Sequence, residues 1–307
     1  MNIDDYITAV MSVKQLVSSE DTKYFEAIYY NTFPMMQRFE LPELRVYNTY
    51  NICTRMLCYN KKPYLIFDNN MHDYIQLSTY SLFSDEALDN YKSLFYAIRA
   101  DYWRSKHDTQ KAEKYQAMMR KYPFILPNYS EEEQNILYNI KYVSFPLQCF
   151  HEIVHYYIIG ELKKEEIRKL IVGAMQKAEE GFYKTYRFHS LLLCDDHFKE
   201  EIYCDCEALY AVILLFSEYR NQISIKDIVD AAMLNLIGIA LITEAKDDSG
   251  TAYYKRLYLR FMVLAQFIKQ LIIEEYIPED SYEDIEAITR YFFEDIYPLV
   301  IDIKNDV

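Results

Sequence analysis

Apolar and polar residues follow two different periods along this chain. An apolar residue every three or four positions predicts a first helix over residues 4–19. Residues 43–57 and 63–67 are instead rich in Val, Ile, Tyr and Thr, which predicts two strands with a hairpin around residues 59–62. After residue 73 the helical period returns and continues to the end of the sequence.

Capping residues mark the boundaries of the later helices. Ser84 precedes two acidic residues and predicts the start of a long helix that ends at Tyr122, before Pro123. Ser130 and Glu133 have the spacing of a capping box for the next helix. Further helices are predicted over residues 145–160, 163–182, 195–219, 224–245, 252–276 and 281–303.

These elements predict a mainly α (α+β) protein, a multi-helix body with a small N-terminal hairpin or sheet. The sequence has only 5 Gly and 8 Pro, too few for the many tight turns of an all-β sandwich or barrel. Neither an internal repeat nor a shift in composition divides the chain. We therefore expect a single domain over 1–307, with a helix and small sheet in 1–70 and a helical body in 71–307.

Charge and cysteine content limit the partners and the compartment. The chain has 33 Lys and Arg against 47 Asp and Glu, a net charge of -14, which disfavours nucleic acid and anionic membranes as partners. The apolar stretch 231–245 is too short to cross a bilayer and predicts a buried helix. Six cysteines without a CxxC pair, and an N-terminus without a signal-peptide pattern, predict a reducing, cytoplasmic location. The oligomeric state cannot be inferred from these features.

One motif in the sequence indicates a metal-binding and catalytic site. Residues 151–155 read His-Glu-Ile-Val-His, the HExxH pattern. On a helix, His151 and His155 lie on one face and both imidazoles can bind one zinc ion, while Glu152 can take a proton from water at that ion. Apolar neighbours predict that this helix is largely buried, where unsatisfied polar side chains are costly. The alternative is an amphipathic helix with two half-exposed histidines.

The third metal ligand is predicted on a later helix. Glu201 and Asp205 are separated by four residues in an otherwise apolar helical stretch. Glu201 is the expected ligand, and Asp205 is expected to accept a hydrogen bond from the second ring nitrogen of a ligating histidine. His197 shares the face of Glu201 and could be a ligand or a donor to substrate. The alternative for Glu201 and Asp205 is a solvated helix face.

Other metal-binding residue types are expected to be structural. Cys149, Cys204 and Cys206 have no paired spacing, and we expect them to be small buried apolar residues. His72 and His107 have no motif around them and are predicted to lie on the surface, and His189 is predicted to lie in a loop.

HExxH followed by ExxxD on a later helix resembles the gluzincin zinc metallopeptidases, here as His151-Glu152-x-x-His155 and Glu201-x-x-x-Asp205. The wider layout resembles cytoplasmic HExxH peptidases of bacteria and mobile elements, such as the Lit phage-exclusion family. In that layout a further helix begins with a basic residue, which is Arg256 here. The His-Pro pair that often precedes it is missing from this sequence.

The resemblance implies a zinc-dependent peptidase that hydrolyses a protein or peptide, with Glu152 as general base. A tyrosine, His197 or Arg256 would stabilise the oxyanion, and the sequence does not choose among them. Two alternatives stay open. One is a non-catalytic helical interaction or toxin–defence protein with a structural or vestigial metal site, and the other is a metal-dependent hydrolase of a non-peptide amide.

Overall fold

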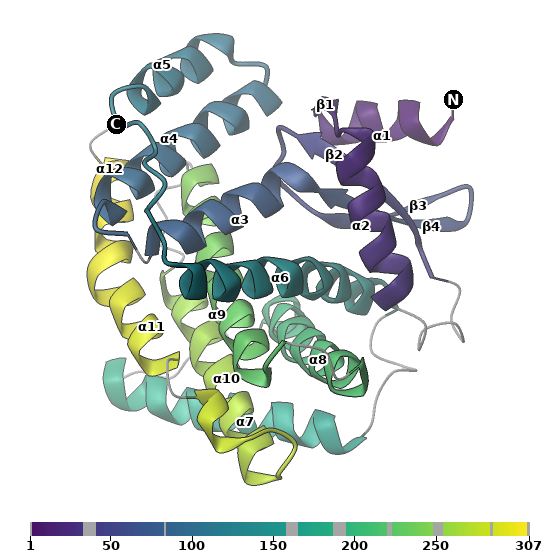
Figure 1. The fold of residues 1–307 in the computed structure, drawn as a ribbon, viewed down its shortest axis with the longest axis vertical. Coiled ribbons are helices and arrows are strands. Elements are labelled where there is room, and N and C mark those ends of the chain that lie inside the picture. Colours follow the sequence, from purple (N-terminus) through teal and green to yellow (C-terminus); the bar gives the residue numbers. More distant parts are fainter. Residues whose placement is uncertain are drawn as a thin grey trace. The chain divides into compact units, whose positions relative to one another are not determined.

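The structure is a computed structural model, mainly helical with a four-stranded sheet near the N-terminus, which confirms the predicted fold class (Figure 1). It describes residues 2–32, 41–82, 84–157, 165–186, 195–219, 223–247, 254–282 and 285–305. The chain forms two compact units. Unit 1 comprises Met1–Leu137, Ile237–Thr251 and Glu294–Val307, and unit 2 comprises Tyr138–Leu236 and Ala252–Phe293. The expectation of a single domain stays a prediction, and each unit is described by itself.

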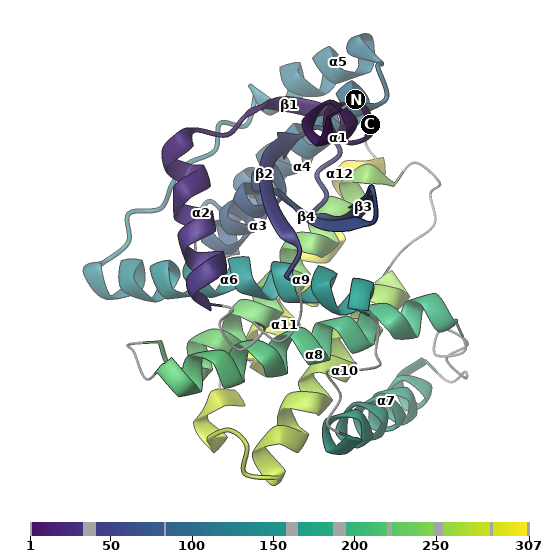
Figure 2. The same cartoon turned by 90° about the vertical axis from the view of Figure 1, so that its right-hand side faces the viewer.

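The sheet of unit 1 combines one parallel and two antiparallel pairings. Its strands are β1 (Val13–Leu16), β2 (Glu43–Thr49), β3 (Arg55–Tyr59) and β4 (Lys62–Asp68), in the order β1-β2-β4-β3 (Figure 2). The central strands β2 and β4 are parallel, and the edge strands are antiparallel to them. Tyr59 pairs with Lys62, which confirms the predicted hairpin. The strand predicted over 43–57 is two strands, because the chain turns at Ile52, where φ is 50°.

The prediction of one helix over residues 4–19 is wrong. Helix α1 covers Ile3–Met11 and stops at Ser12, which has a φ of 50° in the left-handed region. The next residues form β1, and a separate helix α2 covers Ser19–Thr32. Pairing of β1 with β2 satisfies the backbone of this segment and overrides its helical spacing of apolar residues.

Side chains alternate between the two faces of β4. Tyr64 and Ile66 belong to the buried cluster that includes residues of α1. Phe67 points to the other face, where its ring lies 4.9 Å from that of Phe25 in α2 and 5.5 Å from that of His72. His72 is only 1% exposed, so the prediction that it lies on the surface is wrong. Its ring fills the core beneath the sheet between two phenylalanines.

The helices α3 (Asn69–Leu82), α4 (Ala87–Ser105), α5 (Thr109–Met119) and α12 (Tyr297–Asn305) complete unit 1. Helices α4 and α5 lie side by side in Figure 1. The single helix predicted over 84–122 is therefore wrong. His107 has a φ of 60°, which ends α4, and the Asp108 carboxylate caps α5 by accepting a hydrogen bond from the backbone of Lys111.

Unit 2 contains most of the long helices. They are α6 (Glu131–Tyr157), α7 (Glu165–Tyr186), α8 (Asp196–Tyr219), α9 (Ile225–Lys246), α10 (Tyr254–Ile273), the short 3-10 turn Glu279–Tyr282 and α11 (Ile285–Tyr291); α6 and α9 also contribute residues to unit 1. The capping box of Ser130 and Glu133 is confirmed at the start of α6. This helix continues through Pro146 and joins two helices predicted separately. The helix predicted over 281–303 is instead interrupted and includes a π-helical turn at Phe292–Ile296.

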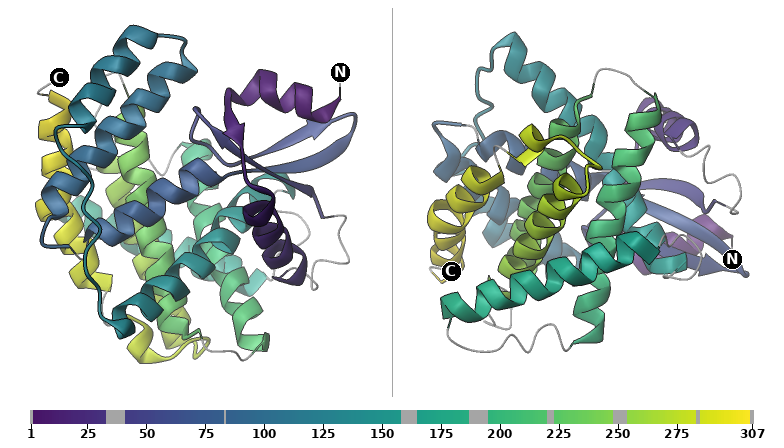
Figure 3. Two further views of the ribbon diagram at one scale, coloured as in Figure 1. Left: turned by 45° about the horizontal axis from the view of Figure 1, so that its top comes forward. Right: turned by 90° about the horizontal axis from the view of Figure 1, so that it is seen from below.

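Small residues let α7 approach α10 closely (Figure 3). A Cβ atom at Gly173 would lie 3.2 Å from the amide of Gln270, and one at Gly181 would lie 2.9 Å from the methyl group of Met262. Helix α10 also packs against α8. This packing brings side chains of α10 toward the acidic residues of α8.

A buried polar network joins α6 to α9 within unit 2. The Oδ1 atom of Asn235 accepts hydrogen bonds from the Ser144 hydroxyl at 2.9 Å and from the Gln148 amide at 3.1 Å. The Asn235 amide donates to the backbone carbonyl of Ala231 at 2.7 Å. Gln148 lies one helical turn before Glu152, so this network holds α6 in place one turn before the HExxH residues.

Among the described helices, α9 is long and apolar enough by length and composition to span a membrane. However, 89% of its apolar window is buried within the protein, a property it shares with the core helices of soluble proteins. The expectation that membranes are not partners stays a prediction.

We expect Asn235→Ala to lower the free energy of unfolding by about 1–3 kcal/mol, because it leaves buried polar groups of α6 without this acceptor. Urea unfolding followed by circular dichroism measures the change. Asn139→Ala is the matched control, since Asn139 also joins α6 to α9, through Asp227, but is only partly buried. The control should lose about 1 kcal/mol or less, and equal losses would contradict a special role for the buried network.

Candidate metal centre

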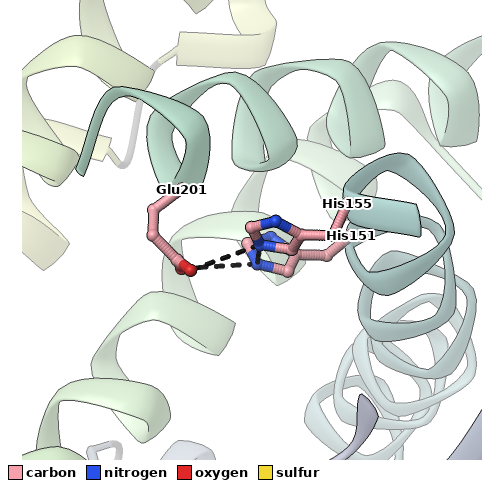
Figure 4. A group of neighbouring side chains, drawn as sticks. All are labelled: His151, His155 and Glu201. Carbon is pink, nitrogen blue, oxygen red and sulfur yellow. Dashed lines mark hydrogen bonds and ion pairs between the residues drawn. The ribbon is translucent and has the colours of Figure 1, made fainter. Parts of the chain in front are cut away.

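Two helices of unit 2 each present a pair of polar side chains four residues apart. On α6, His151 and His155 lie on one face, while Ile153 and Val154 are buried in the core. On α8, Glu201 occupies the facing position (Figure 4). The buried sides of the two helices fix their rotation, so the three polar side chains converge.

The three side chains match the spacing of a tetrahedral metal site. The Nε2 atoms of His151 and His155 are 3.1 Å apart. Glu201 places Oε2 at 3.5 Å from Nε2 of His151 and Oε1 at 3.2 Å from Nε2 of His155. Tetrahedral zinc with ligand bonds of 2.0–2.2 Å holds its ligand atoms about 3.3–3.5 Å apart. In the part of the chain that the structure describes, this is the one candidate group for a metal ion.

Each imidazole has a carboxylate next to its Nδ1 atom. Nδ1 of His151 lies 3.1 Å from Oδ1 of Asp205, and Nδ1 of His155 lies 3.1 Å from Oε1 of Glu200. A neutral imidazole that donates its Nδ1 proton to a carboxylate keeps the lone pair of Nε2 for a metal. Both rings are therefore held with Nε2 directed at the position between them and Glu201.

The electrostatics of the cluster favour ionised carboxylates and protonated imidazoles while no metal is bound. Burial opposes the charge on His151, but hydrogen bonds with Asp205 and Glu201 outweigh it and raise the pKa of His151 to about 10. For His155, hydrogen bonding to Glu201 likewise overcomes burial and raises the pKa. Burial would raise the pKa of Glu201, yet the two histidines lower it well below its usual range. A metal ion must therefore displace protons from the imidazoles.

Glu152 follows His151 on α6, and its charge reaches groups on both helices of the site. Burial is the main cause that raises the pKa of the Cys149 and Cys204 thiols, and the negative charge of Glu152 adds to it in both cases. The same charge helps to raise the pKa of His151 after burial and the contacts with Asp205 and Glu201. Because Cys204 belongs to α8, the carboxylate of Glu152 acts on both helices of the site.

Arg256 and His197 lie at the start of their helices. The guanidinium of Arg256 is 3.2 Å from Oδ2 of Asp195, whose other oxygen accepts a hydrogen bond from the backbone of Phe198 and so caps α8. His197 is 76% exposed, and its Nδ1 atom lies 4.0 Å from Glu200. A role for either residue toward substrate stays a prediction.

Two residues of the cluster were not found from the sequence. Glu200 precedes the predicted ligand Glu201, and Arg260 in α10 makes two hydrogen bonds with Asp205. Spacing along one helix cannot reveal Arg260, because its contact depends on how α10 packs against α8. The cysteines Cys149, Cys204 and Cys206 are buried as predicted and His107 is exposed as predicted, whereas His189 lies outside the described residues.

Comparisons with protein-family models, with curated proteins and with solved structures found no match to this chain.

We expect the purified protein to bind about one zinc or cobalt ion per chain, since three protein ligands suffice for such a site. His155→Ala should remove the ion and should also lower the stability, because metal binding and folding are linked at a buried site. Elemental analysis and the absorption spectrum of the cobalt form measure the loss of the ion, and urea unfolding followed by circular dichroism measures the loss of stability. His197→Ala, on the exposed start of α8, is the control and should keep the ion. Full zinc occupancy in His155→Ala would show that the ligand assignment is wrong.

Proposed function

We propose that the protein is a zinc-dependent peptidase. The observation that carries the proposal is the convergence of His151, His155 and Glu201. The two Nε2 atoms are 3.1 Å apart and lie 3.5 and 3.2 Å from the two oxygens of Glu201, and Glu152 follows His151 on α6. Imidazole and carboxylate donors at this spacing suit zinc better than the octahedral oxygen sites preferred by magnesium or manganese.

The number of donors supports a catalytic site over a structural one. Structural zinc sites take four protein ligands, usually with several cysteines. Here three side chains of the described residues converge, and Cys149 and Cys204 are protonated, since burial raises the pKa of both thiols. A three-ligand site leaves a coordination position for water or substrate.

The residues of the site have different roles in the proposed peptide hydrolysis. A zinc ion held by His151, His155 and Glu201 would act as a Lewis acid on the substrate carbonyl and on water. Glu152 takes a proton from the attacking water and returns it to the departing amine as the carbon–nitrogen bond breaks. Asp205 and Glu200 hold the two imidazoles in their ligating orientation.

The substrate is a protein or peptide, and the net charge of -14 favours neutral or basic segments. A tyrosine, His197 and Arg256 stay the candidate donors to the oxyanion. A non-catalytic interaction protein with a structural or vestigial metal site and a hydrolase of a non-peptide amide are the competing proposals. Both predict that no peptide bond is cleaved.

The carboxylates of the site should respond differently to substitution. Glu152→Gln should keep zinc bound and lower peptide cleavage by about 100-fold or more, the usual effect of a positioned general base. Glu201→Gln replaces a charged ligand with a weak neutral one and should lower zinc affinity itself. Asp205→Asn should weaken zinc binding by about 10- to 100-fold, as for other partners of ligating histidines. Zinc content is measured by elemental analysis.

Cleavage is measured by mass spectrometry of new N-termini in a proteome-derived peptide mixture incubated with zinc-loaded protein. Zinc-loaded Glu152→Gln and chelator-treated wild type are the controls, and neither should produce the new termini. If Glu152→Gln loses zinc while Glu201→Gln keeps it, the two roles are reversed. If fully zinc-loaded wild type produces no new termini, the metal site is non-catalytic toward peptides.

A further inference from the structure

Arg260 lies in the interior of unit 2, where an arginine needs a specific partner. Its side chain is 10% exposed, and its helix neighbours Leu259 and Phe261 are fully buried. A buried guanidinium without a paired anion would destabilise the fold strongly. The position of Arg260 is therefore tied to the anions that it contacts.

Two nitrogen atoms of the Arg260 guanidinium donate hydrogen bonds to Asp205. Nε donates to Oδ2 at 2.8 Å and Nη2 donates to Oδ1 at 2.7 Å. Such a two-bond pair fixes the plane of the carboxylate as well as its position, which a lysine cannot do. Asp205 is only 8% exposed, so few water molecules can reach these bonds.

One of these Asp205 oxygens also contacts the predicted metal ligand His151. Oδ1 of Asp205 accepts from Arg260 and also lies 3.1 Å from Nδ1 of His151. A rotation of the Asp205 carboxylate would break the bond to the ring. The third guanidinium nitrogen, Nη1, is 3.6 Å from Oε2 of Glu201, so Arg260 also attracts the ligand carboxylate itself.

We propose that Arg260 is a positioning residue of the metal centre: it locks Asp205, and through Asp205 the ring of His151, in the orientation that binds the ion. This inference rests on the proposed metal-dependent function. It assigns to α10 a part in the site, in addition to the ligands from α6 and α8. The affinity for the ion, and not the chemistry of the reaction, is what Arg260 controls directly.

Arg256 offers a matched control on the same helix, one turn before Arg260. It also pairs with an aspartate, Asp195, but the pair is exposed, with 44% of the Arg256 side chain accessible. Arg256→Gln therefore removes an arginine–aspartate pair from α10 without touching Asp205 or His151. It should leave the affinity for zinc unchanged.

The experiment measures zinc affinity by competition with a chromophoric chelator for the full-length wild type, Arg260→Gln, Asp205→Asn, the double variant and Arg256→Gln. Arg260→Gln should bind zinc about 10- to 100-fold more weakly than wild type. If Arg260 acts mainly through Asp205, the loss in the double variant should be clearly smaller than the sum of the two single losses, because these then largely share one cause. The absorption spectrum of the cobalt form should change in Arg260→Gln and not in Arg256→Gln.

Two results would overturn the inference: an affinity of Arg260→Gln within about 2-fold of wild type, or losses that add fully in the double variant. Should Arg260→Gln fail to fold by circular dichroism, Arg260→Lys decides, since it keeps the charge and loses the two-bond pair. A weaker affinity in folded Arg260→Lys supports the inference, and an unchanged affinity overturns it. If the wild type binds no ion, the proposed function itself is contradicted. If the wild type binds zinc and cleaves peptides, and Arg260→Gln binds zinc equally well, only the role of Arg260 is contradicted.

Discussion

The burial of two imidazoles among carboxylates is the constraint on which the site of this protein depends. His151 and His155 are only 16% and 20% exposed, on a helix whose Ile153 and Val154 are packed in the core. Polar groups in such a place must be satisfied by the protein or by a ligand. Glu201 faces both Nε2 atoms, and the spacing of these three side chains is that of ligands around one small cation.

The formal charges of the cluster favour a cation. Glu152, Glu200, Glu201 and Asp205 contribute four negative charges and Arg260 one positive charge, which leaves three negative charges around two neutral imidazoles. A bound cation would offset part of this charge. While no metal is bound, protons take its place, and this is the physical reason that the pKa values of both histidines are raised. Metal binding is then an exchange of protons for an ion at nearly constant charge.

Local spacing predicted the core of the site, and only three-dimensional packing could add the rest. His151, His155, Glu201 and Asp205 were all found from two i, i+4 pairs, because each pair is fixed by the geometry of its own helix. Arg260 belongs to a third helix, and nothing in its own segment distinguishes it from Arg256. The same limit applies to the fold. The breaks at Ser12 and His107 come from single residues in the left-handed region, which leave little trace in a hydrophobic pattern.

The two arginines of α10 show how burial assigns different roles to the same chemistry. Arg256 pairs with the residue that caps α8, at a solvent-exposed position where an ion pair contributes little to stability. Arg260, one turn later, faces the interior and holds a carboxylate that is itself bonded to a ligand. Without Arg260, the buried Asp205 would lose its compensating charge, which water cannot supply. In the proposed metal centre, the identity of residue 260 is therefore constrained, although its side chain contributes no ligand atom.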